Sequence, residues 1–281
     1  MNRDDERVRP VRRLVRGQET ADGAGVRLTR VIGTHQLLQL DPFLLLDDFR
    51  SDDPDDYIGG FPAHPHRGFE TVTYLLAGKV EHRDNAGHAG VLQAGGVQWM
   101  TAGRGVIHSE MPMQEQGLLA GFQLWVNLPA AQKMVQPHYQ EFDAAAIPLE
   151  RREDGVELRV VAGKTSCGTR GPVTDLATPA RYFDITLPAG TGLSEPLPAA
   201  FNAFVYLVEG RLDIGGQPLE ARSLAVLGAG DRVVLDAREP SRLLLVAGLP
   251  LNEPIARRGP FVMNSEAELR QAFDDYQAGR F

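Results

Sequence analysis

Short apolar or alternating segments follow one another along most of the chain, separated by turns rich in glycine and proline. Little helical periodicity appears between them, and short strands with frequent turns are typical of antiparallel sandwiches and barrels. In the first half, strands are expected over 69–76, 91–101 and 118–128. In the second half, they are expected over 157–162, 181–187, 203–208, 211–214, 223–227, 232–235 and 242–246. The pattern therefore predicts an all-β fold.

The pattern changes near the C-terminus, where one helix is expected. Ser265 is a favourable N-cap, and Glu268 follows it at the spacing of a capping box. Gly279 supplies a stop signal at the other end. These signals predict a short helix near 265–278.

Two parts of the chain resemble each other. The segment FETVTYLLAGKV from Phe69 matches FNAFVYLVEGRL from Phe201, and TAGRGVIH from Thr101 matches GAGDRVVL from Gly228. Self-similarity of this kind indicates two copies of one structural unit. We therefore expect two β-barrels, joined by a connector over 130–156.

The candidate chemistry lies in the first copy, in the pairs His64-Pro65-His66 and His108-Ser109-Glu110. Residues i and i+2 of a strand point to the same side, so each pair can aim two ligands at one point. Three imidazoles and one carboxylate suit a divalent first-row metal with positions left open for water or substrate. This ligand set leaves open both zinc chemistry and oxygen chemistry on iron, manganese, cobalt or nickel.

The second copy lacks all four of these side chains. The positions aligned with the two pairs are Pro196, Pro198, Leu235 and Ala237. A histidine needed only for packing would be equally useful in both copies, so the loss of the whole set favours a shared function in the first barrel. The second barrel is then a scaffold or lid.

Several neighbours of the pairs are further candidates. Glu70 shares strand parity with His64 and His66, which makes it a second-shell partner of an imidazole, a ligand, or a solvated residue, and we favour the first. His82 and His88 lie in a polar hairpin and are expected to face water. Apolar residues near the pairs predict a pocket for a flat organic molecule, with plain barrel core as the alternative. They are Phe61, Trp99, Met111, Phe122 and Trp125.

Composition narrows the classes of function. The 281 residues are 43% hydrophobic and 23% charged, as in a soluble globular protein, and the net charge of −8 argues against direct binding of nucleic acid. Cys167 is the only cysteine, which excludes an intrachain disulfide and a cysteine-based zinc site and fits a reducing cytoplasm. The sequence has no apolar run of membrane-spanning length and no signal pattern, so a cytoplasmic protein that does not enter membranes is expected.

Long motifs in the chain resemble the pirin family of the cupin superfamily. The matching segments are DPFLLLDDF (41–49), HPHRGFETVTYLL (64–76), QWMTAGRGVIHSEMP (98–112), LWVNLP (124–129) and GPFVMNSEAEL (259–269). The resemblance implies two stacked cupin barrels, each a double-stranded β-helix or jelly roll, with a short C-terminal helix. It implies a metal-bearing barrel over 1–134, a barrel without ligands over 135–250, and a tail over 251–281 that returns to the first barrel.

The resemblance also implies a metal and its ligands. Iron(II) would be held in the first barrel by His64, His66, His108 and Glu110, with manganese, cobalt, nickel, zinc and copper as other divalent candidates. Ordinary cupins place a glutamate ligand four residues after His-x-His, where this chain has Glu70. Pirins are thought to use the carboxylate of His-x-Glu instead, which leaves the role of Glu70 open.

Two functions follow from the resemblance. The first is a quercetin 2,3-dioxygenase, an oxidoreductase that opens a small aromatic flavonol with O2 and releases carbon monoxide, with Glu110 as ligand and catalytic base. The second is an iron-dependent, redox-sensing regulator that binds a protein partner in transcription or metabolism. The aromatic residues near the pairs favour the enzyme, and a monomer is expected.

Overall fold

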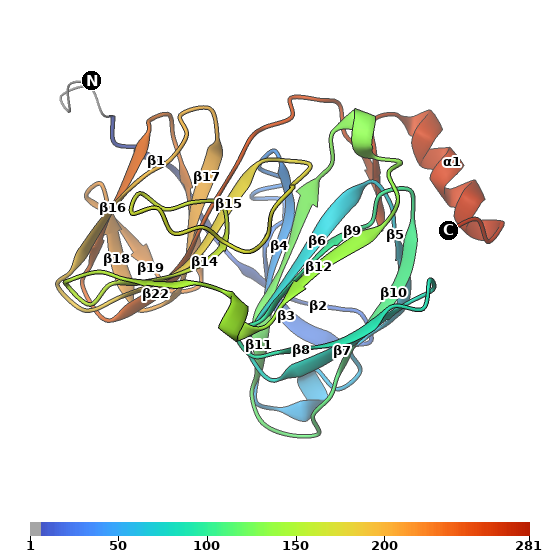
Figure 1. Cartoon of the computed structure of the whole chain (residues 1–281), viewed down its shortest axis with the longest axis horizontal. Helices are drawn as coiled ribbons and strands as arrows, with labels where there is room; N and C mark the ends of the chain where they lie inside the picture. The colour runs from blue at the N-terminus through green and yellow to red at the C-terminus, as the bar shows by residue number, and fades with distance from the viewer. Residues whose placement is uncertain (1–6) are drawn as a thin grey trace. The chain divides into compact units, whose positions relative to one another are not determined.

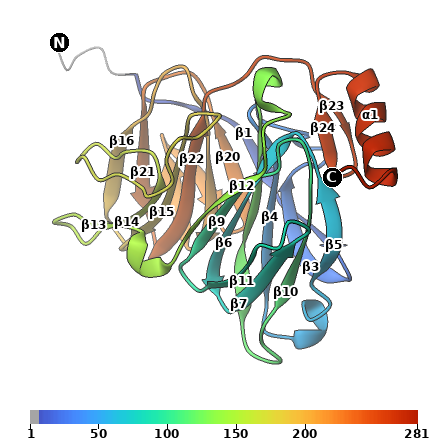
Figure 2. The same ribbon diagram turned by 45° about the vertical axis from the view of Figure 1, so that its right-hand side comes forward.

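The structure is a computed structural model that describes residues 7–281 (Figures 1 and 2). The chain forms two compact units. Unit 1 contains the N-terminal residues up to Gly17 together with Ala146–Pro250, and unit 2 contains Gln18–Ala145 together with Leu251–Phe281. Each unit has one seven-stranded and one four-stranded sheet. The expected all-β fold of two jelly-roll barrels with a short C-terminal helix is confirmed.

Unit 2 has its seven-stranded sheet in the order β12-β9-β6-β11-β4-β3-β2 and its four-stranded sheet in the order β5-β10-β7-β8. The strands of the larger sheet are β2 (Gln18–Asp22), β3 (Val26–Ile32), β4 (Phe43–Ser51), β6 (Phe69–Ala77), β9 (Val97–Thr101), β11 (Leu119–Asn127) and β12 (His138–Phe142). Those of the smaller sheet are β5 (Phe61–His66), β7 (Lys79–Asp84), β8 (Ala89–Gln93) and β10 (Val106–Pro112). Single 3-10 turns are η2 (Pro54–Asp56), η3 (Ala130–Gln132) and η4 (Ala144–Ala146).

The C-terminal tail adds a small β-ribbon and a helix to unit 2. The ribbon consists of β23 (Ala256–Arg258) and β24 (Phe261–Met263), and the helix is α1 (Glu266–Gln277). Ser265 caps α1 and forms the predicted capping box with Glu268. The capping residues therefore identified the start of the helix correctly.

Unit 1 repeats the same plan. Its larger sheet has the order β1-β20-β17-β22-β15-β14-β13, and its smaller sheet has the order β16-β21-β18-β19. The strands of the larger sheet are β1 (Val11–Arg16), β13 (Leu149–Arg151), β14 (Glu157–Ala162), β15 (Ala180–Leu187), β17 (Asn202–Glu209), β20 (Ser223–Leu227) and β22 (Ser241–Gly248). Those of the smaller sheet are β16 (Gly192–Pro196), β18 (Arg211–Ile214), β19 (Gln217–Glu220) and β21 (Arg232–Ala237).

Unit 1 packs apolar side chains where unit 2 has its His-x-Glu pair. Leu235 and Ala237, which align with His108 and Glu110, are buried in the hydrophobic core of unit 1. Apolar side chains from both of its sheets meet in that core, and their burial stabilises the unit.

Strand pairing places Leu193 opposite Leu235 and Glu195 opposite Val233, as His64 and His66 lie opposite His108 and Val106. The alignment of His64 and His66 with Pro196 and Pro198 is therefore wrong, because sequence similarity alone does not fix the register of paired strands.

Three details differ from the sequence expectations. The N-terminal segment belongs to unit 1 rather than to the first barrel, because β1 pairs antiparallel with β20. Residues 135–145 belong to unit 2 rather than to the second barrel, because β12 pairs antiparallel with β9. The segment 91–101 forms two strands, β8 and β9, because the chain turns at Gly95, which has a φ of +81°. The tail after Leu251 lies in unit 2.

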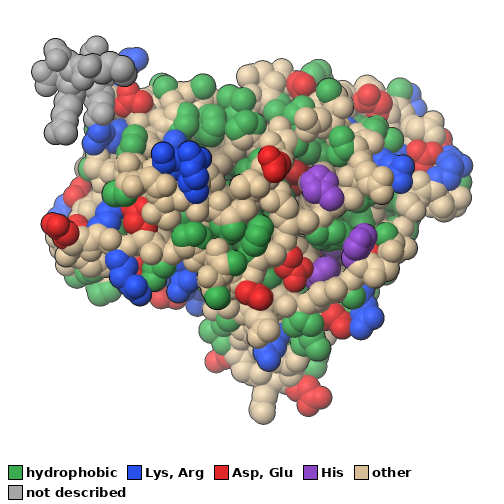
Figure 3. Space-filling model, in the orientation of Figure 1, with side chains coloured by type: hydrophobic (Ala, Val, Ile, Leu, Met, Phe, Trp, Pro, Cys, Tyr) green, Lys and Arg blue, Asp and Glu red, His purple; other side chains and the backbone are tan. Residues whose placement is uncertain are grey.

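On the face seen in Figure 3, lysine and arginine side chains are interspersed with acidic ones. In the described part of the chain, no helix combines the length and apolar character that a membrane crossing needs.

Candidate metal centre

His64 and His66 lie on β5 with Pro65 between them, so both imidazoles point to the same side of the four-stranded sheet. Strand β10 pairs antiparallel with β5 and places His108 directly opposite His64. Two strands far apart in the sequence thus supply the three histidines. The pairing is what brings the His-x-His and His-x-Glu motifs together.

The three imidazoles converge. His64 Nε2 lies 3.0 Å from His66 Nε2, and one ring nitrogen from each histidine can be chosen so that all three lie within 4.8 Å of one another. The His108 ring centre lies 4.5 Å from that of His64 and 5.0 Å from that of His66. Among the described residues, the side chains of His64, His66 and His108 are close enough together to hold a metal ion.

Burial keeps the imidazoles of His66 and His108 neutral. Burial lowers the pKa values of His66 and His108 well below the ordinary value, and the neighbouring histidines lower them further. The Pro260 carbonyl near His66 and the Asp84 carboxylate near His108 oppose this shift. A neutral imidazole has a free lone pair, which is the form that binds metals.

The hydrogen bonds of the triad also fit a metal. His64 Nδ1 lies 2.8 Å from the Pro62 carbonyl oxygen and donates a hydrogen bond to it. The lone pair of His64 Nε2, on the side that faces His66, is therefore available to bind a metal ion. Within the described residues, neither ring nitrogen of buried His108 has a hydrogen-bond partner. A buried ring nitrogen without a hydrogen-bond partner costs folding free energy. A divalent ion bound by the three rings would remove that cost.

Glu110 lies two residues after His108 on β10 and faces the same interior. Its carboxylate is not part of the nitrogen cluster. Instead, the Thr73 hydroxyl on β6 lies 2.9 Å from Glu110 Oε1 and 2.7 Å from the side-chain amide of Gln123. The hydroxyl has one proton, so it donates to Glu110 when the NH2 group of Gln123 is the one that faces it. The predicted fourth ligand is therefore near the triad, but it is held by a threonine of the other sheet.

Glu70 lies away from the histidines. It is buried on β6, where its Oε1 accepts a hydrogen bond from the Thr101 hydroxyl at 2.7 Å. Because Glu70 and Thr73 are three positions apart on one strand, their side chains lie on opposite faces of the sheet. Neither the ligand nor the second-shell role fits this position. Strand parity does not carry over from His66 to Glu70 because the chain changes sheets at Gly68, between β5 and β6.

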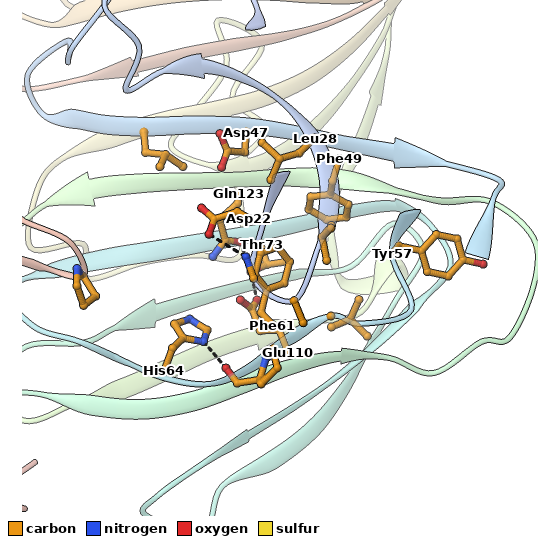
Figure 4. Close-up of a pocket in the computed structure, with 18 of the residues that line it drawn as sticks. Asp22, Leu28, Asp47, Phe49, Tyr57, Phe61, His64, Thr73, Glu110 and Gln123 are labelled. Atoms are coloured by element: carbon orange, nitrogen blue, oxygen red, sulfur yellow. Dashed lines mark hydrogen bonds between the residues drawn. The ribbon is translucent and has the colours of Figure 1, made fainter. Parts of the chain in front are cut away.

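A cavity of about 620 Å³ opens beside the triad (Figure 4). His64, His66, Thr73 and Glu110 line it, together with the amide side chain of Gln123. Its apolar lining residues are Val26, Leu28, Leu45, Phe49, Tyr57, Phe61, Val80, Leu119 and Trp125. The cavity is thus a largely apolar chamber with several polar groups in its wall.

Only two of the predicted pocket residues line this cavity, Phe61 and Trp125. Phe122 is fully buried on β11, and its odd spacing from Trp125 directs it to the opposite face of the sheet. Trp99 is likewise buried outside the cavity lining, and Met111 alternates with Glu110 on β10. For Trp99 and Phe122, the alternative of plain core packing was correct.

The sequence interpretation missed the charged part of the lining. Arg30 on β3 donates from Nε to Asp47 Oδ1 at 2.9 Å, and from Nη2 to Asp47 Oδ2 and Asp22 Oδ2 at 2.7 Å each. The hydrogen bonds to Asp47 raise the pKa of Arg30. The available signal was Asp47 itself, an acid within an apolar strand, since a buried carboxylate requires a partner.

The hairpin histidines differ from each other. His88 is exposed, as expected, and its Nδ1 lies 2.9 Å from Asp84 Oδ2. The expectation that His82 faces water is wrong, because the residue is buried and its Nε2 lies 2.7 Å from Glu141 Oε2. His82 pairs across the strands with Glu110, so the inward alternation of β7 determines its orientation.

The C-terminal tail contacts the residue that follows His66. The buried Arg67 donates from Nη1 to Asp275 Oδ2 at 2.7 Å, and its guanidinium carbon lies 4.3 Å from the centre of the Phe281 ring. Arg67 Nε donates to the Arg104 carbonyl oxygen. The helix α1 thereby anchors the corner between β5 and β6.

Comparisons with known proteins agree with this architecture. The pirin family model matches residues 25–126, and the model of the pirin C-terminal cupin domain matches residues 182–281. A pirin-like protein of Caulobacter vibrioides is 53% identical over 98% of this chain and 99% of its own, and human pirin is 44% identical over 94% and 90%. The crystal structure of a quercetin 2,3-dioxygenase from Acinetobacter baumannii superposes with a TM-score of 0.91 at 35% identity, covering 98% of this chain and 99% of that one. The chain therefore belongs to the pirin family of two-barrel cupin proteins.

Proposed function

We propose that the protein is a metal-dependent dioxygenase of the quercetin 2,3-dioxygenase type, which opens a flavonol-like ring with O2. The observation that carries the proposal is the combination of three converging imidazoles, a carboxylate and a largely apolar cavity at one site. The likeness to the Acinetobacter baumannii enzyme supports it. A cavity of about 620 Å³ is within the usual range for ligand sites of 300–1,000 Å³.

In this proposal His64, His66 and His108 hold iron(II), for which other divalent first-row ions could substitute. When bound, the metal lowers the pKa of a coordinated substrate hydroxyl and brings the substrate and O2 together. Neutral imidazoles leave the charge of the ion largely uncompensated, which favours an anionic form of the substrate.

Glu110 is the proposed base. Its carboxylate accepts the proton of the substrate hydroxyl at Oε2, while the Thr73 hydroxyl keeps Oε1 fixed. Phe61 and Trp125 contribute aromatic surface that orients a planar ring and displaces water from it. The overall reaction consumes one O2 per flavonol and yields carbon monoxide and the ring-opened ester.

The test is turnover of quercetin by iron-loaded protein. Purified protein is loaded with iron(II) under nitrogen, mixed with quercetin and exposed to air, and both the loss of flavonol absorbance and the release of carbon monoxide are followed. We expect turnover with carbon monoxide, abolished in His66→Ala and Glu110→Ala. Bound iron without turnover would contradict the proposal and would favour the iron-sensing regulator, which a pull-down with ferrous and ferric protein would then test.

A further inference from the structure

Two arginines line the cavity, and they differ in their partners. Arg30 is neutralised by Asp22 and Asp47, with short bonds to both. Arg257, from β23 of the C-terminal tail, forms no ion pair with any carboxylate in the described part of the chain. Its one hydrogen bond runs from Nη1 to the Leu44 carbonyl oxygen at 2.9 Å.

Arg257 is positioned close to the triad through one aromatic ring. Its guanidinium carbon lies 4.8 Å from the centre of the Trp125 ring, and the centre of that ring lies 5.3 Å from that of His66. Stacking of this kind holds the guanidinium plane in place and leaves its edge free. The indole therefore sets a fixed separation between the cation and the metal-binding imidazoles.

The charge of Arg257 is only partly compensated by its surroundings. Burial and the positive charge of Arg30 lower the pKa of Arg257, and Asp47, which is already bonded to Arg30, opposes this effect. Arg257 is nevertheless an exposed residue and is part of the cavity lining, so a ligand in the cavity can reach it. A guanidinium with free N–H groups beside an apolar chamber is suited to a carboxylate or an ionised phenol.

We propose that Arg257 is a specificity residue that selects planar aromatic substrates carrying an anionic group at the end away from the oxygen that meets the histidines. The inference rests on the proposed function and names its substrate class. The anionic group forms charge-assisted hydrogen bonds with the free edge of Arg257, while the ring packs against Phe61 and the other apolar walls. A neutral flavonol is then a weaker substrate than its carboxylate analogue.

The test compares two probes that differ only in charge, 3-hydroxyflavone and 3-hydroxyflavone-4′-carboxylate. Their fluorescence is titrated with zinc-loaded protein under nitrogen, so that binding is measured without turnover. The variants are Arg257→Met and the matched control Arg258→Met, which removes the positive charge of the next residue of β23. Arg258 is exposed, contacts Glu266 at 3.5 Å and is not part of the cavity lining.

We expect the carboxylate to bind the unsubstituted protein about tenfold more tightly than 3-hydroxyflavone, which corresponds to about 1.4 kcal/mol. Arg257→Met should abolish this preference and Arg258→Met should retain it, and added salt should weaken it. Equal binding of the two probes, or a preference that survives in Arg257→Met, would overturn this inference and leave the proposed function intact. If neither probe binds, the inference and the proposed function fall together.

Discussion

The hydroxyl of Thr73 and the carboxylate of Glu110 lie 2.9 Å apart and join the two sheets of unit 2 across its cavity. Thr73 belongs to β6 of the larger sheet and Glu110 to β10 of the smaller one. The link holds the proposed base beside the imidazoles in a defined orientation. It also explains how a carboxylate that is almost completely buried is stabilised.

Replacing Thr73 tests this link. Thr73→Val removes the donor with little change in shape, and a hydrogen bond to a charged group contributes about 1.5–3 kcal/mol. We expect kcat for quercetin to fall by about tenfold or more, with iron content unchanged. Thr73→Ser keeps the hydroxyl and should restore most of the rate; a Thr73→Val enzyme with normal kcat would show that the link is dispensable.

Metal binding should depend on the triad. Binding to the folded state alone raises the melting temperature, so iron(II) or nickel(II) should stabilise the unsubstituted protein. His66→Ala should lose this stabilisation and the bound metal, as measured by thermal shift and elemental analysis. His88→Ala removes an exposed histidine outside the triad and should behave like the unsubstituted protein. Equal metal content in the two variants would contradict the assignment.

The metal-free protein should lose stability in mild acid. Burial lowers the folded-state pKa values of His66 and His108, whereas the unfolded chain binds protons near the ordinary value of about 6.5. As the pH falls below about 6.5, the unfolded state gains protons that the folded state does not, so the free energy of unfolding decreases. The free energy of unfolding can fall by at most about 1.4 kcal/mol per pH unit for each of the two histidines.

Denaturant unfolding of the metal-free protein at pH 7 and pH 5.5 measures this dependence. His108→Gln removes one of the two groups and should flatten the dependence, whereas His88→Gln should leave it unchanged. If stability instead rose as the pH is lowered from 7 to 5.5, the sign would be opposite to that expected and would refute the neutral, buried state of His66 and His108.

The contact between Arg67 and Asp275 should stabilise the corner after His66. Both side chains are largely buried, and the hydrogen bond from Arg67 is the main reason that the pKa of Asp275 is lowered. Asp275→Asn should cost about 1–3 kcal/mol of unfolding free energy and weaken metal binding. Asp274→Asn, at the exposed neighbouring position, should cost much less. Equal effects of the two substitutions would show that the contact has no special role.

The sequence predicted those features that depend on local signals or on internal similarity. The capping box at Ser265 located α1, and the internal repeat correctly indicated two barrels. The His-x-His and His-x-Glu pairs indicated a histidine site because strand alternation fixes which side chains point the same way. These inferences needed no knowledge of how distant strands pair.

Features that depend on sheet pairing could not be predicted. Glu70 was misjudged because the change of sheets at Gly68 cannot be recognised from alternation alone. The ion pair between Arg30 and Asp47 exists because these residues are direct partners on β3 and β4. Arg257 reaches the cavity from the far end of the chain, and only the folded tail shows that it lies against Trp125.

The most direct test of the central proposal is the fate of labelled oxygen. Iron-loaded protein is given quercetin under ¹⁸O2, and the ring-opened product is examined by mass spectrometry. The proposed dioxygenase should place two ¹⁸O atoms in each product molecule and release unlabelled carbon monoxide. A product with one labelled atom or none would contradict it, because the ring would then have been opened by monooxygenation or by water.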